Sequence, residues 1–139
     1  MLFCSFFPFY MILIDIHVFV PPVSPWEIFE QAKGESSETV RKRVISAREI
    51  QKERFIKFGH PELLTNSQLK GDLLEDAVQL DNEAQKLLIR FAEQFKLSAR
   101  GYHRTLRLAR TIADLQNETK VLKMHIAEAL NYRRVMPAK

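Results

Sequence analysis

Hydrophobic residues recur every three or four positions through most of the chain after residue 34, which is the spacing of one face of an α-helix. Several of these segments begin with a side chain that can accept hydrogen bonds from free backbone N–H groups: Ser36 or Ser37, Asp81 and Ser98. The pattern therefore predicts helices over these ranges: 35–58, 66–74, 81–95, 98–115 and 121–132.

The residues before this region follow another pattern. Residues 12–20, ILIDIHVFV, are β-branched or aromatic with polar side chains at alternate positions, which is typical of a strand that ends at Pro21-Pro22. Ser24 as N-cap and Pro25 at the first helical position predict a short helix over 24–34. The predicted fold class is mainly α: a bundle of about six helices preceded by a short strand.

The apolar faces of these helices define the expected core. In the helix over 35–58 the stripe contains one polar residue, Gln51, and these apolar ones: Val40, Val44, Ala47, Phe55 and Phe58. The helix over 81–95 is expected to direct inward Ala84, Leu87, Leu88, Phe91 and Phe95. We expect three helices to share one core built from Leu87, Leu88, Phe91, Leu106, Leu108, Ile112 and Ile126.

Composition narrows the classes of protein to consider. At 139 residues the chain is long enough for one modest core, and its 4 glycines and 6 prolines favour helices. The net charge of +4 permits contact with phosphates. A single cysteine, Cys4, excludes an internal disulfide framework and indicates a reducing, cytoplasmic setting. The uncharged run over 1–14 is shorter than the roughly 20 residues of a membrane helix and lacks a signal peptide's basic region, so no membrane role is expected.

The most distinctive feature is the arginine-rich helix over 98–115. At about 100° per residue, one sector contains Arg100, Arg104, Arg107 and Arg110 together with His103, Thr111 and Asp114. The opposite side contains Tyr102, Leu106, Leu108, Ala109, Ile112, Ala113 and Leu115. Arg100 lies in the first turn, where the helix dipole disfavours a cation unless an anion is near. The spacing fits two hypotheses, a phosphate-binding face or a solvated basic face.

No other catalytic chemistry is indicated. The sequence contains no GxxxxGK[ST] phosphate loop and no apolar run ending in paired acids that would hold magnesium. Its four histidines are scattered, so no metal site is predicted, and no serine or cysteine lies in a nucleophile motif. We expect no catalytic residues, and no enzyme activity from the chain by itself.

Several segments of the chain carry a resemblance to a known family. The most distinctive is LSARGYHRTLRLARTIADL at 97–115. The other segments are LIDIHVFVPPV at 13–23, GESSETVRKRVISAREIQKER at 34–54, Asn66 and Leu69 of an N-x-x-L element, LDNEAQKLL at 80–88 and HIAEALNYR at 125–133. These segments resemble, in the same order, the C-terminal region of the magnesium-chelatase-like AAA+ ATPases, the ComM/YifB competence protein family, and the resemblance covers about residues 13–134.

This resemblance implies a helical lid domain of an AAA+ ATPase without the ATP-hydrolysing core. Family members have a protease-like domain, a core that uses ATP and Mg²⁺, and this lid. They assemble into ATP-driven rings. The competence members are associated with DNA branch migration. Arg100 matches the lid's sensor-2 arginine, which reaches the γ-phosphate, and Arg104 and Arg107 are expected to support an anion face. The implied partners are an AAA+ core or neighbouring ring subunits, and DNA through that complex. No cofactor is expected for the chain alone.

The amino-terminal part departs from the family. The family reads LDRIDIH where this chain reads ILIDIH, so Leu13 stands where an arginine finger is expected. We interpret residues 1–12 as an unrelated apolar leader, 13–23 as the strand and Pro-rich linker left from the core, 24–134 as the helical lid and 135–139 as a tail.

Three hypotheses about function remain. The chain is a lid fragment that is inactive alone, or a free-standing basic module that binds DNA through the arginine face and the helix over 41–57, or a non-functional remnant of an interrupted gene. The helix spacing shows no clear helix-turn-helix in support of the second.

Overall fold

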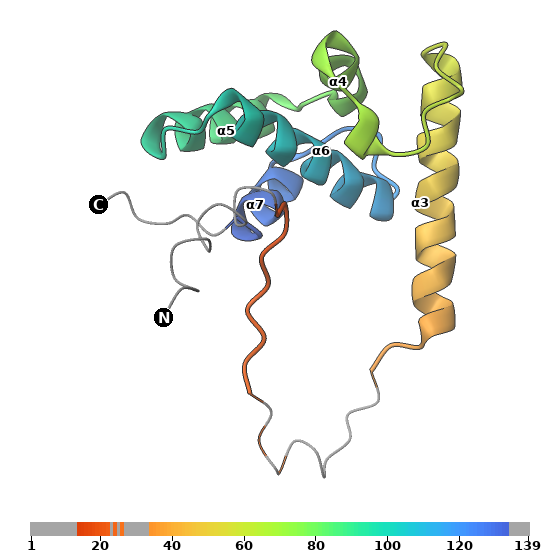
Figure 1. Ribbon diagram of the computed structural model, residues 1–139, viewed down its shortest axis with the longest axis vertical. Coiled ribbons are helices and arrows are strands. Elements are labelled where there is room, and N and C mark those ends of the chain that lie inside the picture. The colour runs from red at the N-terminus through yellow and green to blue at the C-terminus, as the bar shows by residue number, and fades with distance from the viewer. Residues whose placement is uncertain (1–13, 23, 25, 27–33, 134–139) are drawn as a thin grey trace, which may run out of the picture.

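The computed structural model describes residues 14–22, 24, 26 and 34–133 (Figure 1). Within them the chain forms five α-helices and one 3₁₀ helix: α3 (Ser37–Lys57), η1 (Asn66–Gln68), α4 (Gly71–Val78), α5 (Asn82–Gln94), α6 (Ala99–Leu115) and α7 (Lys123–Asn131). These residues form no β-strand, and Leu80 and Val121 make an isolated parallel bridge. The mainly α fold predicted from the hydrophobic pattern is confirmed.

The polar residues that were expected to cap three helices do so. Ser36 Oγ accepts the Thr39 N–H at 3.2 Å at the start of α3. At the start of α5 the Asp81 carboxylate accepts the Glu83 N–H at 3.3 Å. Ser98 performs the same role for α6, as described below. Each cap satisfies a backbone donor that has no partner inside the helix, which defines where the helix begins.

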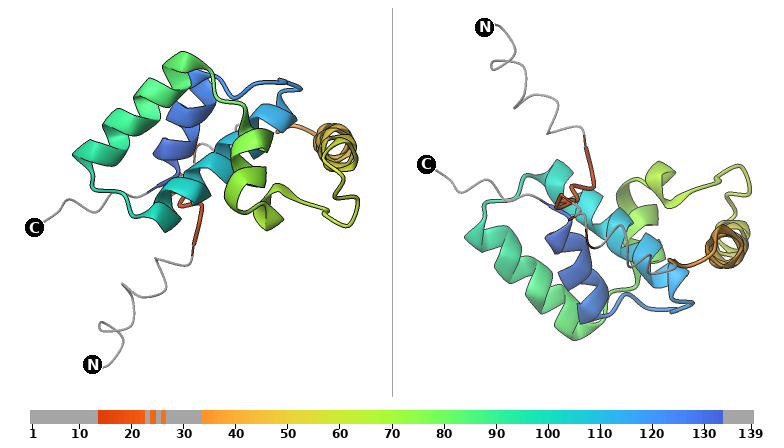
Figure 2. Two further views of the ribbon diagram at one scale, coloured as in Figure 1. Left: turned by 90° about the horizontal axis from the view of Figure 1, so that it is seen from above. Right: turned by 90° about the horizontal axis from the view of Figure 1, so that it is seen from below.

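Helix α6 is the central element of the domain. It packs against α3, η1, α4 and α7, while α5 packs on α7. Seen end-on in Figure 2, α3 stands at one side of the bundle and α6 runs toward it. Buried residues of α6 lie on more than one side of the helix: Gly101, Thr105, Leu106, Ala109, Arg110, Ile112, Ala113 and Asp114. The sequence pattern predicted that the side of the helix with the arginines faces away from the core. This prediction is wrong in the C-terminal half of α6, where Arg110 and Asp114 of that side are buried.

The core contains the residues that the helical spacing placed there. Leu88, Leu106, Ile112 and Ile126 are buried, and Leu87, Phe91 and Leu108 are half-buried against them. Phe95 was expected to point inward but is exposed, because it follows the last turn of α5 as the C-cap. Its ring lies against Phe91, with the centroids 4.3 Å apart.

The single helix predicted over 66–74 is two elements. Asn66–Gln68 is a 3₁₀ turn, and α4 begins only at Gly71. Leu69 and Lys70 between them have extended backbone, and Gly71 has a φ of 52°, a conformation that glycine adopts without strain. This break lets Leu69 enter the core, where it is fully buried.

Only part of the apolar stripe of α3 is buried in the core. Ala47, Gln51 and Phe55 are buried as expected, whereas Val40 and Val44 on the same stripe are exposed. In Figure 1 the N-terminal half of α3 extends beyond the bundle. The expectation that the whole stripe faces the core is therefore wrong, because the bundle reaches only the C-terminal half of the helix.

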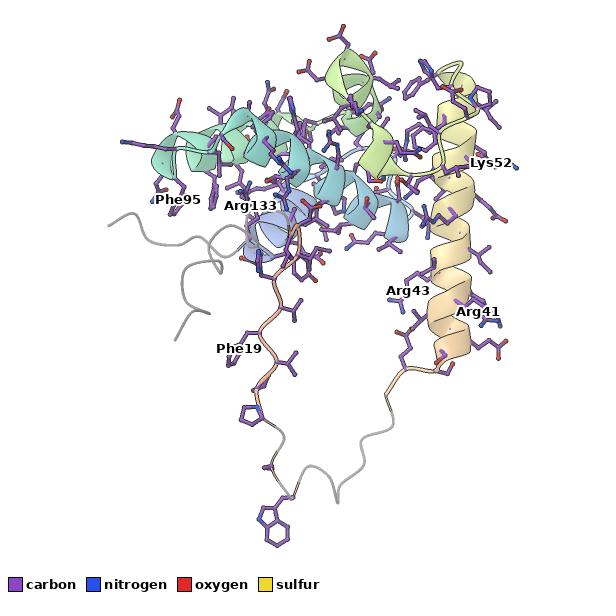
Figure 3. All side chains as sticks on the ribbon, viewed as in Figure 1. Phe19, Arg41, Arg43, Lys52, Phe95 and Arg133 are labelled. Carbon is purple, nitrogen blue, oxygen red and sulfur yellow. The ribbon has the colours of Figure 1, made fainter. Side chains whose placement is uncertain are left out.

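The segment 14–22 is extended and exposed, and its predicted strand is not formed in the part that the structure describes. Polar contacts join it to the bundle. Asp15 pairs with Arg104, and the His17 N–H donates to the Tyr132 carbonyl at 2.8 Å. Phe19, labelled in Figure 3, lies farther along this segment. The predicted helix over 24–34 lies mostly outside the described residues, and the leader and the tail lie wholly outside them.

Candidate functional site

The N-terminal end of α6 presents Arg100 to solvent. Ser98 caps the helix by accepting the Gly101 N–H on its Oγ at 3.2 Å. Arg100 is exposed, and no described residue forms a hydrogen bond or an ion pair with it. Because the guanidinium lies at the positive end of the helix dipole, this end of α6 favours an anionic ligand.

Arg104, one turn later, is engaged by the extended segment. Its Nε forms an ion pair with the Asp15 carboxylate. The side chain of Arg104 is 15% exposed, and that of Asp15 is 59% exposed. The guanidinium is thus already paired with an anionic group of the chain itself.

Arg133 joins this end of α6 from the end of α7 (Figure 3). Its Nη1 donates to the Gly101 carbonyl at 2.7 Å and to Thr105 Oγ1 at 3.2 Å. Gly101 leaves space for the guanidinium, since a Cβ there would lie 2.8 Å from Nη1. Burial, and then the charge of Arg104, lower the pKa of Arg133, while Asp15 acts in the opposite direction. Helical spacing did not identify Arg133 as a site residue. The sequence indicated it only as the last residue of HIAEALNYR at 125–133, one of the segments that resemble the family.

Arg107 links α6 to the connection between η1 and α4. Its Nε donates to the Leu69 carbonyl at 2.9 Å, and the Arg107 side chain is half-buried. No other hydrogen bond joins this guanidinium to a described side chain or carbonyl. The terminal amino groups of Arg107 are therefore not committed to the fold.

Arg110 belongs to the interior, although the helical wheel placed it with the other arginines. It is fully buried, and its Nε donates to Asp114 Oδ1 at 3.0 Å. Its remaining nitrogens donate to the carbonyls of Glu118 and Thr119. Burial lowers the pKa of Arg110, and the Asp114 charge acts in the opposite direction. Arg110 thus holds the loop after α6 and does not reach an external anion.

Asp114 is the centre of a polar network that helical spacing did not predict. Arg54 of α3 forms a bidentate pair with it, in which Nη1 lies 3.1 Å from Oδ2. Asn66 Nδ2 donates to the same oxygen at 2.8 Å. With the bond from Arg110, the buried carboxylate accepts hydrogen bonds from three elements. This network gives the N-x-x-L element a physical role, because Asn66 binds Asp114 while Leu69 enters the core.

His125 is buried in its neutral form. Its Nδ1 accepts the Leu122 N–H at 3.0 Å, so the ring proton is on Nε2. That atom lies 3.0 Å from Gln116 Oε1 and donates to it. Burial, and then the positive charge of Arg110, lower the pKa of His125 from its ordinary value. Protonation of Nδ1 would break the cap of α7.

This arrangement predicts how stability depends on pH. The unfolded chain takes up a proton at the ordinary histidine pKa of about 6.5, while the folded chain takes it up only at lower pH. We expect the free energy of unfolding, measured in urea, to fall as the pH decreases below about 6.5 and to level off below the folded pKa. The variant His125→Asn, whose Oδ1 accepts the Leu122 N–H, should lack this fall.

His60 provides the matched control for that experiment. It is exposed and pairs with Glu62 through Nδ1 at 3.0 Å. His60→Asn should retain the fall in stability below about pH 6.5. If H125N retained it as well, a group other than His125 would be responsible.

The described part of the chain contains neither a metal-ligand cluster nor a membrane-spanning helix. No three His, Cys, Asp or Glu side chains gather there in a way that could hold a metal ion. None of the helices in this part is long and apolar enough to cross a bilayer.

Known proteins resemble the chain over the helical region. Residues 34–133 match the family model described as magnesium chelatase, subunit ChlI C-terminal. The chain is 38% identical over 104 residues to the competence protein ComM of Haemophilus influenzae, which covers 75% of this chain and 19% of ComM. It is 34% identical over 122 residues to the protein YifB of Salmonella typhimurium, covering 87% of this chain and 23% of YifB. The chain thus spans about a fifth of the length of these curated relatives.

Proposed function

The chain belongs to the family of the C-terminal domain of the magnesium chelatase subunit ChlI, and we propose that this lid-type domain contacts the phosphates of a nucleotide through Arg100. The nucleotide and its Mg²⁺ would be held by an AAA+ core of a parent protein or of a neighbouring ring subunit. The contribution of this chain is one sensor-2 cation that stabilises negative charge on the phosphates. By the family resemblance, the proposal extends to an ATP-driven motor that processes DNA, and the likeness to the competence protein ComM fits a role in competence.

One observation supports this assignment above the others. Among the four arginines of α6, Arg110 is buried, Arg104 is paired with Asp15 and Arg107 donates to Leu69. Arg100 is the exposed one without a partner among the described residues. A guanidinium suits this task because its planar array of donors matches two phosphate oxygens.

Arg104 and Arg107 follow Arg100 at intervals of four and three residues along α6, and both also hold the structure. Arg107 has terminal amino groups outside the hydrogen bond to Leu69, and these suit an anion face as well. Arg133 carries its charge to the same end of α6 through its bond to Gly101. Loss of Arg100 should therefore affect nucleotide chemistry without a large loss of stability.

A lid exchange tests the proposal. In ComM of Haemophilus influenzae, the matching region is replaced by residues 34–133 of this chain, and steady-state ATP hydrolysis is measured. Arg100→Ala in this chimera is expected to lower kcat by at least about tenfold, because a donor aimed at developing negative charge is lost. The melting temperature should remain within the range of ordinary surface substitutions.

Arg90 of α5 is the matched control, since it is also an exposed arginine on a neighbouring helix. Arg90→Ala in the same chimera should leave kcat unchanged. Equal turnover in the R100A and R90A chimeras would contradict a phosphate-contacting role for Arg100. The isolated chain is expected to show no ATP turnover, because a phosphate loop is absent from its sequence.

A further inference from the structure

The extended segment over residues 14–18, which we call the strap, is held on the bundle by polar contacts. Asp15 forms an ion pair with Arg104 in the second turn of α6. Two residues later, the His17 N–H donates to the Tyr132 carbonyl at 2.8 Å. Tyr132 is the C-cap of α7, and the last carbonyls of a helix have no donor within it. Beyond these contacts the chain leads away from the helices (Figure 1).

The strap can leave the bundle without uncovering the hydrophobic core. Its side chains Ile14, Ile16 and Val18 are 50%, 47% and 65% exposed. The core cluster is built from Phe55 and residues that follow it in the sequence. The ion pair of the strap is weak as well, because Asp15 is 59% exposed and water and salt screen its charge. An anionic ligand with more charge than one carboxylate can therefore displace the strap.

Asp15 is the counter-ion of positively charged side chains at this end of α6. Arg104 lies one turn after Arg100, so the two are neighbours on the helix surface. Arg133 reaches the same part of α6, where its Nη1 donates to the Gly101 carbonyl at 2.7 Å. Burial and then the charge of Arg104 lower the pKa of Arg133, whereas Asp15 acts in the opposite direction. The Asp15 carboxylate thus offsets positive charge one turn from the guanidinium that is proposed to contact phosphate.

We infer that Asp15 holds the strap in the place of a phosphate on Arg104, and that the phosphates of a nucleotide bound at Arg100 release it. A triphosphate has more negative charge and more acceptor oxygens than a carboxylate, and it can contact two guanidinium groups that lie one turn apart. Arg104 then becomes the second phosphate contact, and the strap is released only when nucleotide is bound. The inference rests on the proposed function, because it requires phosphate at Arg100.

Titration of the 139-residue chain with inorganic tripolyphosphate tests this exchange. The Kd is measured at low salt from the NMR shifts of the backbone amides. Asp15→Asn removes the competing charge and should lower the Kd by about threefold, the effect of one partly exposed ion pair. Asp72→Asn is the matched control, because it removes the same charge from an exposed position on α4 and should leave the Kd unchanged.

The His17 amide reports directly on the strap. In the wild-type chain its hydrogen bond to Tyr132 should slow exchange with water. Saturating tripolyphosphate should speed this exchange by at least about threefold, because the hydrogen bond opens when the strap leaves. Sodium chloride at the same ionic strength should have a smaller effect. In D15N the amide should exchange rapidly before any ligand is added.

Arg100→Ala separates this inference from the proposed function. If R100A abolishes tripolyphosphate binding while D15N binds as the wild type does, Arg100 contacts phosphate and the inference about the strap is wrong. If D15N binds more tightly and R100A binds as the wild type does, phosphate displaces Asp15 from Arg104 without Arg100, and the proposed role of Arg100 is wrong.

The inference fails if tripolyphosphate binds while the exchange of the His17 amide stays unchanged, because the strap then remains in place. It also fails if D15N and D72N tighten binding equally, which would show a general effect of net charge. A wild-type chain whose amides do not shift up to about 10 mM tripolyphosphate would overturn it as well, since no phosphate would then displace Asp15. In that case the lid exchange in ComM still tests Arg100 by itself.

Discussion

Replacement of Asp114 with alanine is expected to lower the free energy of unfolding by about 3–5 kcal/mol. The carboxylate is fully buried and accepts hydrogen bonds from Arg110 and Arg54, so its loss leaves two guanidinium groups without their anion. Arg110 cannot turn toward water, because it is itself fully buried and bonded to the loop after α6. Equilibrium unfolding in urea, followed by circular dichroism, measures the change.

Two further variants test the cause of this loss. Asp72→Ala removes an exposed carboxylate of α4 and should change the free energy of unfolding by less than about 0.5 kcal/mol. R110M/D114A removes one of the two stranded cations and should recover part of the loss. A loss below about 1 kcal/mol for D114A would show that the network contributes little to the fold.

Much of the fold follows from local features that a sequence displays. Ser36, Asp81 and Ser98 cap their helices because capping depends on residues within one turn. The buried positions of Leu88, Leu106 and Ile126 follow from helical spacing in the same way. These features are local, so no knowledge of the packing between helices was needed to predict them.

The features that the sequence did not predict depend on contacts between distant segments. The helical wheel places Arg110 and Arg100 in one sector, yet one is buried and the other exposed. The difference arises because Asp114, Arg54 and the loop after α6 enclose Arg110, and these partners come from different elements. A polar residue on a helix can thus face a neighbouring helix as readily as solvent.

The same reasoning explains what was predicted of the candidate site. Arg100 was predicted from its place in the first turn of α6, which is a local property, and from the resemblance of 97–115 to the family. Arg133 comes from another helix and meets Gly101 only in the folded chain. Asp15 meets Arg104 across 89 residues of sequence, a contact that no spacing rule anticipates.

Replacement of Phe55 with alanine is expected to lower the free energy of unfolding by about 3–5 kcal/mol. Phe55 is fully buried and is the one large apolar side chain among the buried residues of α3; the others are Ala47 and Gln51. Arg54 beside it supplies the ion pair with Asp114, so both strong anchors of α3 lie at adjacent positions. In F55A, backbone amide hydrogens should exchange faster along α3 than along α6 and α7. The reason is that α3 would pack less tightly on the bundle without the Phe55 side chain.

Ile56 provides the control at the next position. Its side chain is 53% exposed, so Ile56→Ala should cost far less than F55A and should leave exchange in α3 nearly unchanged. If F55A instead speeded exchange equally in α3, α6 and α7, the helix would be part of one cooperative core. If α3 alone responds, the domain consists of a bundle around α6 and a helix attached at one end. Such an attachment leaves the N-terminal half of α3 available to a partner, because docking that half then displaces no contact of the fold.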